Sequence, residues 1–283
     1  MTYRLDTKEP GFEAAFADFL TSKREVSEDV NKVVHDIIAD VRTRGDEALL
    51  EYTNRFDRQS LTADALAVTP AEIASAVKAC DRETLDALNV AAARIEAFHK
   101  GQMPQDRRYT DSDGVELGEK WTSIGAVGLY VSGGTAAYPS SVLMNAVPAR
   151  VAGVERIVMV VPTPDGVMNN LVLAAAQIAG VSEIYRVGGA QAVAALAYGT
   201  KTIQPVDKIV GPGNAYVAAA KRQVFGTVGI DMIAGPSEIL VLADGENNPD
   251  WIAADLLSQA EHDAVAQSIL MTDDRAFAER VSA

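Results

Sequence analysis

The hydrophobic positions of the first hundred residues recur at helical spacing. Between residues 26 and 41, valine and isoleucine return every three or four positions, which is typical of one face of an amphipathic helix. Gly45 predicts the end of that helix, and Thr69–Glu72 has the pattern of a capping box with proline at the first helical position. A further helix is predicted from 82 to 100. The chain from residue 12 to residue 100 is therefore predicted to be helical.

The pattern changes at Trp121, after which short apolar runs alternate with helical stretches. Each run is three to six residues long, which is typical of strands that are buried on both faces. The runs are 126–131, 157–161, 183–187, 208–210, 238–242 and 268–271. Apolar strands that alternate with helices predict an α/β fold, with parallel βα units and helices on both faces of the sheet.

Glycine and small polar residues cluster where these strands end or begin. The clusters are 132–141, 188–191, 211–214 and 235–238. Glycine allows a backbone to approach a phosphate, and the helix that follows offers free N–H groups and a partial positive charge. Each glycine could instead serve only a tight turn. Four such turns in one sheet favour a nucleotide or phosphate ligand over that alternative.

None of the four turns has the standard dinucleotide-binding fingerprint. Gly211–Tyr216 begins as G-x-G, but Tyr216 stands where a small residue normally allows close packing of helix on strand. Asp231 lies 20 residues after Gly211, where a ribose-binding acid is expected, and we interpret this spacing as coincidence. The P-loop and G-x-S-x-G patterns are absent from the sequence.

A late helix, predicted over 255–263, places Asp255, Gln259 and His262 on one face, because residues three and four apart are neighbours on a helix. Spacing alone favours a solvated polar face and leaves open half of a metal or substrate site. The other two histidines, His35 and His99, lie in predicted helices and are interpreted as structural or surface residues.

Composition narrows the class of protein. With 25 basic and 39 acidic residues, the net charge of −14 argues against nucleic acid as the main partner, because phosphate backbones need a basic face. The sequence has no uncharged apolar run long enough to cross a membrane, and its N-terminus lacks the apolar core of a signal peptide. Its single cysteine, Cys80, excludes an intramolecular disulfide and is expected to be buried rather than catalytic. A cytoplasmic protein is expected.

Five segments of the chain closely resemble the histidinol dehydrogenase family. These are 128–145, 188–191, 206–214, 233–238 and 255–263, in the order and spacing of the family. The resemblance implies two incomplete Rossmann-like domains and a zinc-dependent homodimer. It further implies oxidation of L-histidinol through L-histidinal to L-histidine with two NAD+, the last two steps of histidine biosynthesis.

The resemblance also assigns roles to residues. NAD contacts are implied for Tyr130, Gln191 and Asn214, substrate contacts for Ser237, Gln259 and His262, and zinc ligation for Gln259 and His262. An imidazole is a good zinc ligand, whereas a Gln oxygen is a weaker and unusual one. The family's catalytic base, an adjacent Glu-His pair, is expected beyond Ala283, so no catalytic residue is assigned within this chain.

The resemblance also implies a division into domains. We expect an N-terminal arm at 1–25, a discontinuous α/β domain of 26–124 with 231–283, and a Rossmann-like NAD-binding domain at 125–230.

Because family members continue past the position of Ala283, the chain is interpreted as C-terminally truncated or incompletely recorded. It could therefore be an NAD-binding module without turnover. A related zinc-dependent dehydrogenase of another small alcohol, such as a sulfonated one, is a further alternative. Ser132 stands where the family usually has proline.

Overall fold

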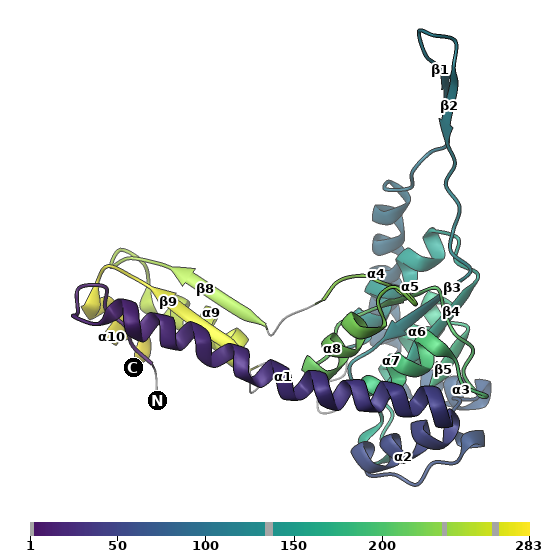
Figure 1. Cartoon of the computed structure of the whole chain (residues 1–283), viewed down its shortest axis with the longest axis horizontal. Coiled ribbons are helices and arrows are strands. Elements are labelled where there is room, and N and C mark those ends of the chain that lie inside the picture. Colours follow the sequence, from purple (N-terminus) through teal and green to yellow (C-terminus); the bar gives the residue numbers. More distant parts are fainter. Residues whose placement is uncertain (1–2, 134–137, 234–236, 262–265) are drawn as a thin grey trace. The chain divides into compact units, whose positions relative to one another are not determined.

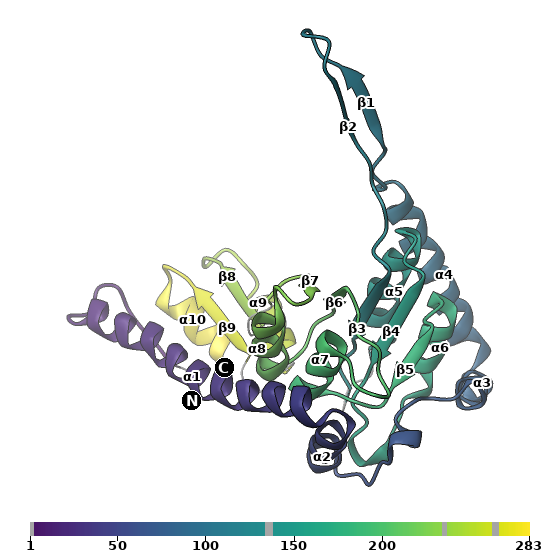
Figure 2. The same ribbon diagram turned by 45° about the vertical axis from the view of Figure 1, so that its right-hand side comes forward.

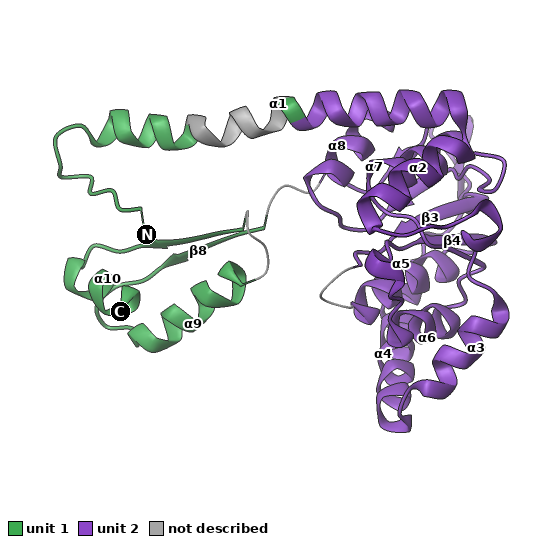
Figure 3. Ribbon diagram, turned by 90° about the horizontal axis from the view of Figure 1, so that it is seen from below, with its two compact units in different colours: residues 1–29, 234–283 green, residues 30–233 purple. Residues whose placement is uncertain are grey.

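The computed structural model describes residues 3–133, 138–233, 237–261 and 266–283, with only the helical backbone for 21–28 (Figure 1). Internal contacts divide the chain into two compact units, residues 1–29 with 234–283 and residues 30–233 (Figure 3). The three-part division expected from the family resemblance stays a prediction.

The helical character predicted for the first hundred residues is confirmed. The elements are α1 (Phe12–Arg44), α2 (Asp46–Asp57), the 3-10 turn η1 (Ala63–Ala65), α3 (Pro70–Ala79) and α4 (Arg82–Lys100). Helix α3 begins at the predicted capping box. The Glu72 backbone N–H donates to Thr69 Oγ1 at 3.3 Å, and the Thr69 backbone N–H donates to Glu72 Oε2 at 2.9 Å. These two bonds satisfy backbone donors that the first helical turn leaves without partners.

A five-stranded parallel sheet forms the centre of the larger unit and confirms the α/β class. Its strands are β3 (Ala126–Tyr130), β4 (Arg156–Val160), β5 (Glu183–Tyr185), β6 (Lys208–Val210) and β7 (Gly229–Ile230), in the order β5-β4-β3-β6-β7. The connecting elements are α5 (Pro139–Val151), the 3-10 turn η2 (Pro164–Gly166), α6 (Asn170–Ala179), α7 (Gly189–Tyr198) and α8 (Ala215–Val224). This order matches the first five strands of the Rossmann order 3-2-1-4-5-6. The two-residue strand β7 has no apolar run and was not predicted.

Helices cover both faces of this sheet (Figure 2). Val127 and Leu129 of β3 belong to one apolar cluster, with residues of α3, α4, α5 and α6. Tyr130, which points to the opposite face, belongs to a second cluster with residues of α1, α2, α7 and α8. Both faces are therefore dry, which explains why the strands are apolar without alternation.

A hairpin that no sequence pattern predicted lies between α4 and the sheet. Its strands β1 (Arg107–Thr110) and β2 (Glu116–Glu119) are antiparallel, and all of their residues are exposed. The turn is closed by Asp111, whose Oδ1 accepts from the backbone N–H groups of Asp113 at 3.0 Å and Val115 at 2.9 Å. A strand with no buried face has no hydrophobic pattern to reveal it.

The smaller unit contains the late strands and helices. They are β8 (Glu238–Leu242), α9 (Pro249–Ala260), β9 (Gln267–Met271) and α10 (Arg275–Ser282), and β8 pairs with β9 in parallel. Helix α9 confirms a helix at the predicted late position, although its assigned end is Ala260, and His262 and Asp263 lie outside the described residues. Within the described part of the chain, no helix has both the length and the apolarity to cross a membrane.

Candidate functional site

The order of the five strands places a topological switch point between β3 and β6, and we use the word crevice for the region outside the carboxyl ends of these two strands. From β3 the chain moves outward through β4 and β5, then returns to the other side of β3 to form β6 and β7. In open α/β sheets, ligands bind at such a switch point, outside the carboxyl ends of the strands. Tyr130 is the last residue of β3, Gln191 lies in the first turn of the helix after β5, and Asn214 caps the helix after β6, so all three lie at this edge. The larger unit therefore brings together the three residues predicted to contact NAD.

Gly211, the first residue after β6, lies against the end of β3. Its φ of +110° is in the region that favours glycine, and a Cβ there would overlap the carbonyl oxygen of Tyr130. Its backbone N–H donates to Asp231 Oδ2 at 2.8 Å, and its carbonyl accepts from Lys221 Nζ at 3.0 Å. The turn after β6 is thus packed directly on the end of β3.

Tyr130 forms a hydrogen bond to the turn that precedes α7. Its side chain is buried, and its phenol oxygen accepts a hydrogen bond from the backbone N–H of Gly189 at 2.9 Å. Gly189 is the first residue of α7, and the residue before it, Gly188, has no side chain to cap the helix. The Tyr130 phenol, on strand β3, therefore caps the N-terminus of helix α7 in place of a side chain at Gly188. Burial raises the pKa of Tyr130 to about 12, so the phenol is neutral at physiological pH.

Gln191 lies in the first turn of α7 and is 2 % exposed. Its Oε1 is buried and has no hydrogen-bond partner among the described residues. A Cβ on Gly189 would come within 2.6 Å of that oxygen, so the glycine leaves room for the amide. A buried acceptor without a donor is costly, and a ligand that donates a hydrogen bond here would remove that cost.

Asn214 caps the helix that follows β6. Its Oδ1 accepts from the backbone N–H groups of Tyr216 and Val217, both at 3.1 Å. The oxygen is directed at the helix, which leaves the amide nitrogen as the side-chain donor for a ligand. Ser132, in the turn after β3, donates its hydroxyl to the Pro212 carbonyl at 3.4 Å, a bond that a proline at position 132 could not make.

Residues that were not predicted from the sequence hold these turns together. Pro162, just after β4, lies against Gly188, where a Cβ would overlap the proline ring. The next residue is tied to α2, because the Thr163 backbone N–H donates to Asp57 Oδ2 at 2.9 Å and Gln59 Nε2 donates to Thr163 Oγ1 at 2.8 Å. Burial raises the pKa of the Asp57 carboxyl. No local motif marks this arrangement, because the partners are about a hundred residues apart.

Asp231 was interpreted as a coincidental match to a ribose-binding acid, and its partners in the structure are protein groups. Besides Gly211, its carboxylate accepts from the Met232 backbone N–H at 2.6 Å and pairs with Lys221. One signal could have identified Lys221 from the sequence. It lies on the same face of α8 as Val217 and Val224, so a charge is placed where the helix is otherwise apolar.

The predicted substrate and metal residues belong to the smaller unit. Ser237 is exposed, and its carbonyl accepts from the Gln267 backbone N–H at 3.0 Å, which joins the start of β8 to β9. Gln259 is half-buried in the last turn of α9, and His262 lies outside the described residues. The described ranges contain no group of three or more His, Cys, Asp and Glu side chains that could hold a metal. The roles of Ser237, Gln259 and His262 stay predictions.

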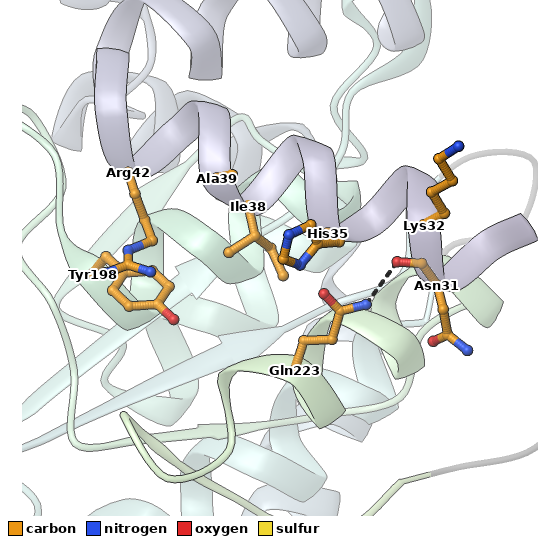
Figure 4. Close-up of a pocket in the computed structure, with 8 residues that line it drawn as sticks. All are labelled: Asn31, Lys32, His35, Ile38, Ala39, Arg42, Tyr198 and Gln223. Atoms are coloured by element: carbon orange, nitrogen blue, oxygen red, sulfur yellow. Dashed lines mark hydrogen bonds between the residues drawn. The ribbon is translucent and has the colours of Figure 1, made fainter. Parts of the chain in front are cut away.

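A hollow of about 490 Å³ in the larger unit lies elsewhere (Figure 4). Tyr198 and Gln223 line it from the ends of α7 and α8, opposite Asn31 and Arg42 of α1. The ends of these helices lie at the amino ends of the strands, because helices in a parallel sheet run back against the strands. Gln223 Nε2 donates to the Asn31 carbonyl at 2.9 Å, and the Arg42 guanidinium stacks on Tyr198 at 4.4 Å from its ring centre. This hollow is separate from the crevice.

Comparison with known proteins gives a consistent result. Residues 20–283 match the model of the family described as histidinol dehydrogenase. The chain is 68% identical over 281 residues to histidinol dehydrogenase of Rhodospirillum rubrum, a match that covers 99% of this chain and 65% of the relative. The same figures hold for histidinol dehydrogenase of Brucella suis. The crystal structure of histidinol dehydrogenase from Elizabethkingia anophelis is 40% identical, with a TM-score of 0.79 over 90% of this chain and 59% of that chain. The chain thus spans about two thirds of the length of these curated relatives.

Proposed function

Because this chain belongs to the histidinol dehydrogenase family, we propose that it carries the NAD-binding part of an enzyme that oxidises L-histidinol through L-histidinal to L-histidine. Each turnover would reduce two NAD+. A homodimer in the cytoplasm and a role in histidine biosynthesis belong to the same proposal. The family assignment supports the reaction, and the crevice at the strand ends supports the cofactor.

The observation that carries the NAD proposal is the buried, unpartnered Oε1 of Gln191 at the switch point of the sheet. Its neighbours suit a dinucleotide. The turns after β5 and β6 bring helix N-termini to this edge, and Asn214 offers an amide nitrogen there. Free N–H groups and the positive end of a helix favour phosphate oxygens. The donors and the orphaned acceptor together fit a ligand that has both anionic and amide groups.

NAD would supply the hydride acceptor in this site. The protein's own part is to bind and orient. The neutral phenol of Tyr130 fixes the first N–H of α7, so the turn at Gly188–Ala190 is held in one position before the ligand arrives. A turn that is already ordered loses little conformational entropy on binding, which favours affinity and correct orientation.

Zinc is proposed on the resemblance alone, with Gln259 and His262 as two of its ligands. A neutral Gln oxygen leaves the ion more positive than a carboxylate would, and such an ion suits the imidazole and amine of histidinol. Two ligands are fewer than the three that a catalytic zinc normally takes from protein. Among residues 3–133, 138–233, 237–261 and 266–283, no cluster of three or more His, Cys, Asp and Glu side chains completes the set.

The direct test of the cofactor site is an NADH titration of this chain, followed by nicotinamide fluorescence. We expect saturable binding that weakens about tenfold in Gln191→Leu, which removes the buried acceptor. The matched control is Gln223→Leu, since Gln223 bonds to Asn31 at the opposite edge of the sheet. Failure of the unaltered chain to bind NADH would contradict the proposal, as would equal losses in the two variants.

A second experiment tests the reaction. The chain is incubated with NAD+, zinc and L-histidinol, and NADH formation is followed by absorbance. Turnover would support the enzymatic assignment for this chain, whereas NADH binding without turnover would identify it as a binding module. Oxidation of a sulfonated alcohol, with none of histidinol, would contradict the proposed substrate.

A further inference from the structure

We propose that Lys221 and Asp231 are positioning residues that hold the turn after β6 in the conformation that binds the cofactor. The inference rests on the proposed NAD site at the carboxyl edge of the sheet. Neither residue is expected to touch the ligand. They act through Gly211, whose backbone they hold on both sides.

Lys221 is a charged residue in a buried position. It is 3 % exposed, and its Nζ donates to the Gly211 carbonyl and forms an ion pair with Asp231. Burying an ammonium group is costly, and an apolar side chain of similar length would fill the same space at lower cost. The charge is therefore explained by what it binds, a carbonyl and a carboxylate that an apolar residue could not satisfy.

Asp231 completes the arrangement from the end of β7. Its Oδ2 accepts from the Gly211 N–H at 2.8 Å, while its Oδ1 accepts from the Met232 N–H at 2.6 Å and pairs with Lys221. One ion pair thus satisfies both the N–H and the carbonyl of Gly211. That residue is buried, has a φ of +110° and packs on the Tyr130 carbonyl. Its peptide groups are left without protein partners if the pair is removed.

The position of the ligand donors depends on this glycine. Asn214 follows three residues later and caps α8, so its amide nitrogen and the first N–H groups of the helix move with the turn. Lys221 lies on the same helix, ten residues after Gly211, and reaches back to the carbonyl that precedes the helix. The body of α8, its N-terminal turn and the end of β7 are thereby joined at the switch point.

The experiment measures NADH affinity and folding separately in Lys221→Met, which keeps the length of the side chain and removes its charge. We expect the dissociation constant for NADH to rise about tenfold at a temperature where circular dichroism shows the variant to be folded. Lys221→Arg, which retains a cation, should recover part of the affinity. A residue with only a structural role would lower the melting temperature and leave the dissociation constant unchanged.

The matched control is Arg156→Met. Arg156 forms a partly buried ion pair with Glu183 at 2.6 Å, near the amino ends of β4 and β5, away from the crevice. The Arg156→Met substitution should lower the stability of the fold without changing NADH affinity. If Lys221→Met does not fold, Asp231→Asn replaces it, because the amide preserves the size of the carboxylate. Unchanged affinity in a folded Lys221→Met or Asp231→Asn overturns this inference alone, whereas no NADH binding by the unaltered chain overturns the proposed function with it.

Discussion

Replacing Tyr130 with phenylalanine tests the idea that a phenol from one strand caps the helix after another. The substitution keeps the ring that packs in the apolar cluster and removes only the oxygen that accepts from the Gly189 N–H at 2.9 Å. Gly188 cannot replace that oxygen, since it has no side chain. The first N–H of α7 then has water as its hydrogen-bond partner, or no partner.

The magnitude follows from the loss of a cap. Removing a capping acceptor typically costs about 1 kcal/mol, and leaving a buried donor unsatisfied costs about 1–3 kcal/mol. Gly189 is only half-buried, so we expect the free energy of unfolding to fall by about 1–2 kcal/mol at neutral pH. NADH affinity should fall with it, because the turn beside Gln191 loses its support.

The same residue predicts a dependence on alkaline pH. Burial raises the pKa of Tyr130 to about 12, whereas a tyrosine in the unfolded chain ionises near 10. Its stabilisation is therefore fully present below pH ~10 and is lost as the pH rises towards ~12, because the unfolded chain releases the proton first. A separation of about two pH units corresponds to about 3 kcal/mol. Tyr130→Phe should lose this part of the alkaline fall in stability.

Urea unfolding at several pH values measures both effects. Tyr185→Phe is the control for NADH affinity only, because burial raises the pKa of Tyr185 to about 12 as well. Tyr185 is buried in the same sheet, and its hydroxyl donates to Glu183 Oε2 at 2.8 Å. Its loss should lower stability while leaving NADH affinity unchanged, since Glu183 keeps its ion pair with Arg156. The reasoning is refuted if Tyr130→Phe is as stable as the unaltered chain and binds NADH equally well, or if both variants weaken NADH equally.

Three further substitutions test the surroundings of the crevice. Gly188→Ala places a Cβ against a proline ring and should cost about 1–3 kcal/mol in urea unfolding, whereas Gly101→Ala, whose Cβ would be 3.4 Å from its nearest neighbour, should be nearly neutral. Burial raises the pKa of Asp57, so the unaltered chain should gain stability as pH falls through that raised pKa towards about 4. Unfolding of Asp57→Asn should lack this gain, and an identical pH profile would contradict the assignment. Ser132→Pro removes the hydroxyl that donates to Pro212 and should change the free energy of unfolding by no more than about 1 kcal/mol. A larger change would contradict the small contribution expected for a bond of this length.

Local sequence patterns predicted much of the secondary structure. The capping box at Thr69–Glu72 and the apolar runs between Ala126 and Val210 predict their elements correctly, because helix caps and buried strands depend on neighbouring residues. The runs 238–242 and 268–271 form strands β8 and β9, but none of their residues is buried, contrary to the expectation for strands covered on both faces. The family motifs identified Tyr130, Gln191 and Asn214 as candidates for one site. A strand without a buried face, as in the hairpin β1–β2, left no such pattern.

The tertiary structure decided how those candidates are supported. Strand order brings Gly211 onto Tyr130, a buried phenol caps a helix 59 residues later, and Asp57 holds a peptide 106 residues away. These contacts depend on which strands become neighbours, and periodicity within a segment carries no information about that choice. The sequence by itself therefore determined the helices, the buried strands and the residues to examine. Only the packing of distant segments determined that Lys221 and Asp231 hold Gly211, because two charges ten residues apart meet there around a single buried glycine.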